Sequence, residues 1–145
     1  MIGFIITGHG SFSPGMAGAM EMITGKQEKV SVIRFLQDMS LEEYSQNIIK
    51  GISNYEQEGL EVIIFTDLLG GTPFKTSVSC AYNNEGVKII SGANLPMLIE
   101  GSMLRLGMSN AGELVDTLLS TGQEGIKCLN LTAELNVEIN DEEGI

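Results

Sequence analysis

Two short apolar runs, at residues 2–6 and 62–65, most constrain what this chain can fold into. The first reads Ile-Gly-Phe-Ile-Ile and the second Val-Ile-Ile-Phe, so each puts apolar side chains on both faces of an extended segment. A strand of this kind has to be covered on both sides, as happens in a parallel sheet flanked by helices. These two segments are therefore predicted to be the central strands of such a sheet.

The rest of the chain alternates between strand and helix patterns. Further strands are expected at 30–35, 87–90 and 126–131, and polar residues within 30–35 indicate an edge strand. A helix is expected around residues 97–106, and four more are predicted to begin at the N-cap residues Ser13, Ser40, Thr72 and Asn110. This alternation predicts an α/β fold, doubly wound, with a mostly parallel sheet.

Length and cysteine content narrow the class of protein. A chain of 145 residues suits one domain with its own core, and no second domain is expected. It contains no run of about 18 apolar residues that could span a membrane, and residues 1–6 are too short and lack the basic start of a signal peptide. Cys80 and Cys128 follow no metal-binding or disulfide pattern, which favours a reducing cytoplasm and a buried packing role for both.

Charge narrows the class of partner. The formal net charge is −11, and the eight Lys and Arg residues are scattered, which argues against nucleic acid and favours a basic protein partner. Part of the acidity lies in residues 132–145, a stretch with no basic residue. We expect this stretch to be a solvated tail.

The only histidine, His9, lies between Gly8 and Gly10 directly after the first apolar run. It is expected at the carboxyl end of a central strand, where open α/β sheets bind ligands, and beside a helix N-terminus whose free amides favour an anion. Filling a loop is the alternative role, but packing explains a histidine at this position poorly. The geometry suits a phosphorylated imidazole.

Asp67 follows the second central strand and is expected to approach His9, because the carboxyl ends of parallel strands lie at one sheet edge. A carboxylate bonded to one imidazole nitrogen fixes the tautomer, leaves the other nitrogen free as a nucleophile and stabilises the cation that forms. The alternative is that Asp67 is a turn residue that bonds its own backbone. The sequence supports both readings equally.

Small residues around His9 and Asp67 could bind a phosphoryl group. Gly71 permits close backbone approach, and Thr72 supplies a hydroxyl at a helix start. The phosphoryl-binding candidates are Gly10, Ser11, Ser13, Gly71 and Thr72. The sequence contains neither a Walker A loop nor a complete dinucleotide fingerprint, and a flavin site is disfavoured. One histidine cannot build a typical zinc site. We therefore expect no metal and no cofactor.

Three segments in this order and spacing, Gly8–Ser11, Phe65–Phe74 and Ser91–Met97, together resemble the IIA component of the mannose family of the bacterial phosphoenolpyruvate-dependent sugar phosphotransferase system. The resemblance covers residues 1 to about 131 and implies a cytoplasmic phosphocarrier. It implies that Nε2 of His9 takes a phosphoryl group from phospho-HPr and passes it to the IIB component. Asp67 matches the carboxylate that orients the histidine, and Thr72 the hydroxyl that helps hold the phosphoryl group.

The resemblance also implies a particular assembly. The family is dimeric, with its last strand exchanged between subunits and paired antiparallel, which would make residues 126–131 the exchanged strand. The IIC and IID membrane components would take part indirectly. Because they would determine which sugar is transported, this sequence does not indicate the sugar. Residues 1–131 are expected to form the IIA domain and 132–145 an acidic tail. The alternatives are a phosphotransfer subunit of a dihydroxyacetone kinase and a non-catalytic, flavodoxin-like module that binds a small anion.

Overall fold

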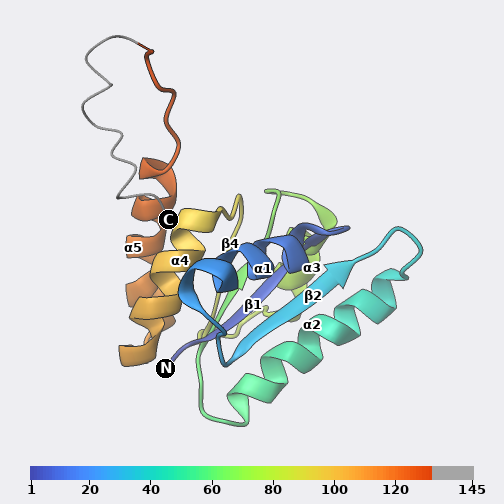
Figure 1. Cartoon of the computed structure of the whole chain (residues 1–145). Coiled ribbons are helices and arrows are strands. Elements are labelled where there is room, and N and C mark those ends of the chain that lie inside the picture. The colour runs from blue at the N-terminus through green and yellow to red at the C-terminus, as the bar shows by residue number, and fades with distance from the viewer. Residues whose placement is uncertain (132–145) are drawn as a thin grey trace.

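The computed structural model describes residues 1–131, and the predicted acidic tail, 132–145, lies outside the described residues. All the strands of its four-stranded sheet are parallel, in the order β2-β1-β3-β4 (Figure 1). The strands are β1 (Gly3–His9), β2 (Val30–Phe35), β3 (Val62–Phe65) and β4 (Val87–Ile90). The helices are α1 (Phe12–Thr24), α2 (Leu41–Glu56), α3 (Thr72–Cys80), α4 (Leu95–Leu104) and α5 (Ala111–Glu124), with a 3-10 turn, η1 (Arg105–Gly107), after α4.

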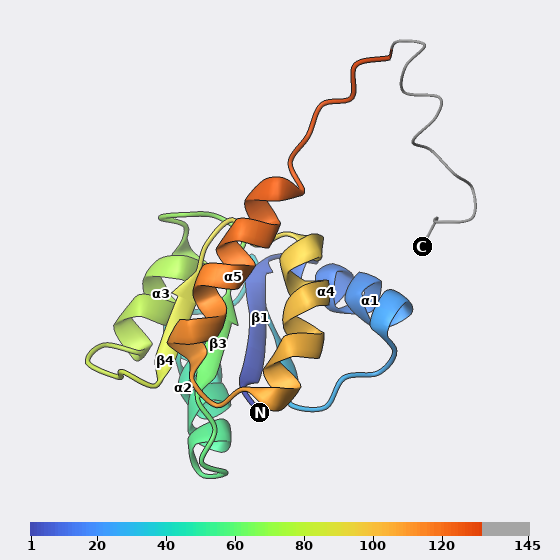
Figure 2. The same ribbon diagram turned by 90° about the vertical axis from the view of Figure 1, so that its left-hand side faces the viewer.

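The helices cover both faces of the sheet. α1, α4 and α5 lie on one face, and α2 and α3 on the other (Figures 1 and 2). Phe4 and Phe65 face the first layer, where their rings meet edge to face with centroids 4.8 Å apart, whereas Ile5 and Ile64 face the second. The predicted doubly wound α/β fold is confirmed, because β1 and β3 bury apolar side chains on both faces.

The order of the strands reverses between β1 and β3. From β1 the chain crosses through α1 to β2 on one side, and it later returns through α2 to β3 on the other side of β1. In such sheets a crevice forms outside the carboxyl ends of the two strands that flank the reversal. His9 ends β1, and Asp67 follows β3 by two residues, so the fold brings both predicted residues to this crevice.

Two of the four predicted helix starts are wrong by one or two residues. α1 has Ser11 rather than Ser13 at its N-cap position, because the Ser13 hydroxyl is buried and donates to the Ile33 carbonyl. α3 has Gly71 rather than Thr72 at its N-cap position, and its first helical hydrogen bond runs from Lys75 N–H to the Gly71 carbonyl.

The other two predicted caps are confirmed. Ser40 Oγ accepts a hydrogen bond from the Glu43 amide, and Asn110 Oδ1 accepts one from the Glu113 amide, each at 3.1 Å. Among residues 1–131, none of these helices combines the length and apolar character needed to cross a membrane.

The segment 126–131 forms no strand in the single chain, contrary to the sequence pattern. It leaves the body of the fold after α5 and is exposed throughout (Figure 2). The exchange predicted for it requires pairing with a second copy of the chain, so the exchange stays a prediction. Cys128, on this segment, is exposed, and the expectation that it is buried is wrong, whereas Cys80 at the end of α3 is half-buried.

Candidate functional site

His9 stands at the open end of β1, with 48% of its side chain exposed. The chain turns directly after it, because Gly10 has a φ of +57°, a conformation that glycine adopts without the strain of a Cβ. The Gly10 amide still bonds to the Phe35 carbonyl, at 2.8 Å. The turn brings the N-terminus of α1, with its unpaired amides, next to the imidazole.

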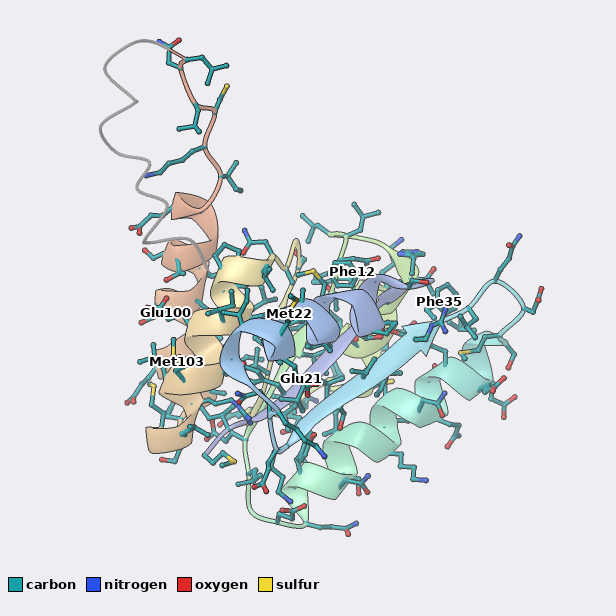
Figure 3. All side chains as sticks on the ribbon, viewed as in Figure 1. Phe12, Glu21, Met22, Phe35, Glu100 and Met103 are labelled. Atoms are coloured by element: carbon teal, nitrogen blue, oxygen red, sulfur yellow. The ribbon has the colours of Figure 1, made fainter. Side chains whose placement is uncertain are left out.

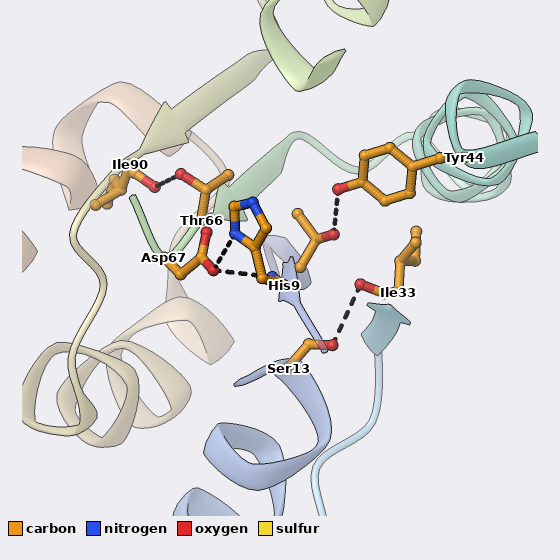
Figure 4. Close-up of polar contacts among 8 residues, drawn as sticks. His9, Ser13, Ile33, Tyr44, Thr66, Asp67 and Ile90 are labelled. Atoms are coloured by element: carbon orange, nitrogen blue, oxygen red, sulfur yellow. Dashed lines mark hydrogen bonds and ion pairs between the residues drawn. The ribbon is translucent and has the colours of Figure 1, made fainter. Parts of the chain in front are cut away.

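The Asp67 carboxylate binds His9 twice. Its Oδ2 atom accepts hydrogen bonds from the His9 backbone N–H and from ring atom Nδ1, each at 2.8 Å (Figure 4). A carboxylate can only accept hydrogen bonds, so Nδ1 carries the hydrogen and Nε2 presents its lone pair. The predicted approach of Asp67 to His9 is confirmed.

The environment of Asp67 keeps its carboxyl group ionised. Burial acts to raise the pKa of Asp67, but the hydrogen bonds from the His9 amide and imidazole, with the electrostatic attraction of His9, outweigh burial and lower the pKa below its ordinary value. The other oxygen, Oδ1, is buried and has no hydrogen-bond partner among residues 1–131. The negative charge is therefore directed mainly at His9, where it stabilises a positively charged imidazole.

An aromatic contact from β2 steadies the imidazole on another side. The Phe35 ring meets the His9 ring edge to face, with centroids 5.7 Å apart, and Phe35 in turn packs on Tyr44 at 4.9 Å. The Tyr44 hydroxyl is hydrogen-bonded to Thr7, and burial raises the pKa of Tyr44 to about 12 although the bond from Thr7 acts to lower it. Phe35 lies at the end of β2, at the same end of the molecule as Phe12 of α1 (Figure 3).

Sequence reasoning missed Phe35 and Tyr44. Phe35 is paired with His9 across β1 and β2, a register that no local sequence signal marks. Neighbouring residues in register on parallel strands point to the same face, so an aromatic residue in that position touches the imidazole.

The loop after β3 closes the site, since Gly71 lies directly against the imidazole. A Cβ atom on Gly71 would stand 3.1 Å from His9 Cε1 and 3.3 Å from the Leu68 carbonyl oxygen, closer than ordinary packing allows. Thr72, the first residue of α3, follows Gly71 and is half-buried. Gly71 thus lies beside His9, and the phosphoryl-binding role of Gly71 and Thr72 stays a prediction.

The other phosphoryl-binding candidates lie at the start of α1. Gly10 and Ser11 are exposed, directly after His9. Ser13 is also close to His9 in sequence, but its buried hydroxyl donates a hydrogen bond to the Ile33 carbonyl (Figure 4). Only the backbone amide of Ser13, in the first turn of α1, is therefore available to an anion.

Residues 91–96, within the third segment that carries the family resemblance, have a structural role. The Ala93 amide donates to the Thr66 carbonyl at 3.0 Å, and the Asn94 side chain donates to the Gly122 carbonyl at 2.8 Å. Thr66 itself donates through its hydroxyl to the Ile90 carbonyl. The 91–96 loop thus ties Thr66, the residue before Asp67, to β4 and α5.

The described part of the chain contains no group of three or more His, Cys, Asp or Glu side chains arranged to hold a metal ion. The site consists of an imidazole with one free nitrogen, an ionised carboxylate, and helix N-terminal amides. This set of groups can accept and hold a small anionic group on nitrogen.

Comparison with known proteins gives the family. The family model described as "PTS system fructose IIA component", where PTS is the phosphotransferase system, matches residues 3–119. Over 132 residues the chain is 31% identical to the PTS system mannose-specific EIIAB component of Escherichia coli, covering 88% of this chain but only 39% of that longer protein. It is 25% identical to the PTS system fructose-specific EIIA component of Bacillus subtilis, covering 88% of this chain and 86% of the relative.

A solved structure agrees with these relatives. The crystal structure of phosphotransferase system component EIIA from Streptococcus agalactiae is 35% identical, has a TM-score of 0.81, and is matched over 88% of this chain and 97% of that one. The family model covers most of the chain, from the first strand into α5. The chain therefore belongs to the family of mannose- and fructose-type IIA components of the phosphotransferase system.

Proposed function

We propose that this protein is a phosphocarrier that accepts a phosphoryl group on Nε2 of His9 from phospho-HPr and passes it to a IIB component. The observation that carries the proposal is the hydrogen bond from His9 Nδ1 to Asp67, which leaves Nε2 as the only free nitrogen of an exposed imidazole. Membership of the IIA family supports the direction of transfer.

The proposed transfer needs positioning and charge stabilisation more than new covalent chemistry. The lone pair of His9 Nε2 attacks phosphorus as the nitrogen–phosphorus bond of phospho-HPr breaks, and the HPr imidazole leaves with that electron pair. The ionised Asp67 stabilises the positive charge that forms on His9. The free amides at the start of α1 and the Gly71–Thr72 turn would hold the phosphoryl oxygens.

The proposed partners follow from the family. Residues 1–131 would act as a IIA domain in the cytoplasm, with IIC and IID membrane components downstream of IIB and residues 132–145 as a tail. The named relatives are specific for mannose and fructose, so we propose a sugar or sugar derivative as the final acceptor.

The direct test is to supply labelled phosphoenolpyruvate, HPr and the enzyme that charges HPr. We expect one acid-labile, alkali-stable phosphoryl group per chain, as a phosphohistidine requires. Absence of label from the intact, folded protein would contradict the proposal and favour the non-catalytic anion-binding module.

Replacing Asp67 with alanine should slow phosphoryl transfer much more than it destabilises the fold. The change removes the hydrogen bond that fixes the imidazole, together with the bond from the His9 backbone N–H, and such losses typically reduce rates by about tenfold to several hundredfold. Single-turnover transfer from phospho-HPr gives the rate, and thermal unfolding gives the stability. Asp116→Ala, which changes an exposed carboxylate on α5, should leave the rate unaltered, and equal rates in both variants would make Asp67 a turn residue only.

Assembly gives another prediction. Deleting residues 126–145 should abolish the proposed dimer, because Ile126, Leu129 and Leu131 are exposed in the single chain and would be covered by exchange with a second copy. Deleting only 132–145 should leave a dimer. Light scattering on the two truncated proteins measures the mass, and a soluble dimer that survives the longer deletion would rule out the exchanged strand as the basis of assembly.

A further inference from the structure

Arg34 binds the turn that follows His9, from the neighbouring edge strand. Its Nε atom donates to the Gly10 carbonyl at 3.0 Å, and its Nη2 atom lies 3.5 Å from Ser11 Oγ. Gly8 is in register with Arg34 across β1 and β2, so the arginine stands beside the end of the strand that carries His9. None of these contacts is needed to complete the sheet.

The charge of Arg34 is not neutralised by a neighbour. Among residues 1–131 the only ion pairs are His9 with Asp67 and Lys29 with Glu58, although the chain as a whole carries a net charge of −11. Arg34 is exposed, and an exposed arginine in so acidic a protein would ordinarily be expected near a carboxylate. Its donors are instead directed at the backbone carbonyl and the hydroxyl of the Gly10–Ser11 turn.

The bond to the Gly10 carbonyl sets the direction of the next amide. Both the N–H and the C=O of Gly10 are directed toward β2, the first to the Phe35 carbonyl and the second to Arg34. In a trans peptide the C=O and the following N–H point in opposite directions, so the Ser11 amide points away from the Arg34 guanidinium. Ser11 occupies the N-cap position of α1, and its amide precedes the first helical hydrogen bond.

From this geometry we infer that Arg34 is a positioning residue for phosphoryl transfer, which holds the Gly10–Ser11 peptide so that its amide faces the phosphoryl group on His9. The inference rests on the proposed function of His9. Without Arg34, Gly10 would be free to rotate its peptide, because glycine has a wide choice of backbone conformation. Arginine is suited to the task since its planar fork of donors fixes an acceptor in direction as well as distance.

The test compares Arg34→Gln with Lys50→Gln. Lys50 lines the same hollow beside β2 as Arg34 and carries the same charge, but it makes no hydrogen bond to the Gly10–Ser11 turn. The measurement is single-turnover transfer over a range of phospho-HPr concentrations. It gives two separate quantities, the transfer rate at saturation and the half-saturating concentration of phospho-HPr. Arg34→Lys, which keeps the charge without the planar fork, is the second variant.

We expect Arg34→Gln to lower the saturating rate by about tenfold to a hundredfold, the usual size for loss of a charged hydrogen bond at a site, with the half-saturating concentration nearly unchanged. Arg34→Lys should recover only part of that rate, and Lys50→Gln should stay within about twofold of the unchanged protein. Equal losses in Arg34→Gln and Lys50→Gln, an effect on the half-saturating concentration alone, or no effect at all would overturn the inference. If the unchanged protein takes no label from phospho-HPr, the proposed function has failed instead.

Discussion

Replacing His9 with alanine is expected to remove all acid-labile phosphorylation by phospho-HPr while the fold remains intact. His9 is the only histidine in the chain, so no second imidazole can take the phosphoryl group. Its side chain is half exposed. The backbone N–H of residue 9 would still donate to Asp67, so we expect the free energy of unfolding to change by no more than about 1 kcal/mol.

Two measurements check the His9 prediction together. Incorporation of label from phosphoenolpyruvate reports on transfer, and thermal unfolding followed by circular dichroism reports on the fold. His9→Gln should behave in the same way, because an amide cannot form a stable phosphoramidate of this kind. Label that is acid-labile and persists in either variant would place the phosphoryl group on another residue.

The largest expected effect on stability comes from Arg105, which lies in η1 and is completely buried. Its guanidinium donates to the carbonyls of Ile2 and Lys29, at 3.0 and 3.4 Å, to the Glu28 carbonyl and to the Gln27 side chain, and it lies 5.0 Å above the Phe4 ring. It therefore joins the end of α4 to the start of β1 and to the connection before β2. Burial lowers the pKa of Arg105, although Tyr55 acts to raise it.

Arg105→Met should reduce the free energy of unfolding by about 2–4 kcal/mol, because methionine fills much of the volume but removes the guanidinium donors from the Ile2 and Glu28 carbonyls. For a domain of this size the melting temperature should fall by roughly 10 °C. Urea and thermal unfolding measure both quantities. Lys50→Met, at an exposed position, is the control and should cost no more than about 0.5 kcal/mol, so equal losses in the two variants would show that burial of Arg105 is not the cause.

The parts of the fold that could be predicted from sequence are those with a local signal. The apolar runs at 2–6 and 62–65 show the need for cover on both faces, and the structure buries both. Glycines on either side of His9 marked the end of β1. The approach of Asp67 then followed from parallel strands alone, because their carboxyl ends share one edge of the sheet.

The parts that could not be predicted depend on which segments meet. Several residues with hydroxyl side chains could cap the start of α1. Ser13 does not, since its hydroxyl donates to the carbonyl of Ile33, a residue distant in sequence. Arg105 stands among leucine residues near a helix end and gives no sign of burial until the starts of β1 and β2 converge on it. Phe35 contacts His9 through the register of neighbouring strands, which a single sequence does not specify.

The single exposed imidazole also restricts how a carrier of this kind can meet its partners. His9 opens to solvent at one end of β1, with Asp67 behind Nδ1 and Gly71 against Cε1. If Nε2 is the atom that both receives and gives the phosphoryl group, donor and acceptor need the same opening, and their complexes with the carrier are mutually exclusive. Under the proposed function, turnover would then alternate between a phosphorylated and an unphosphorylated form, and its rate would depend on how fast one partner leaves before the other arrives.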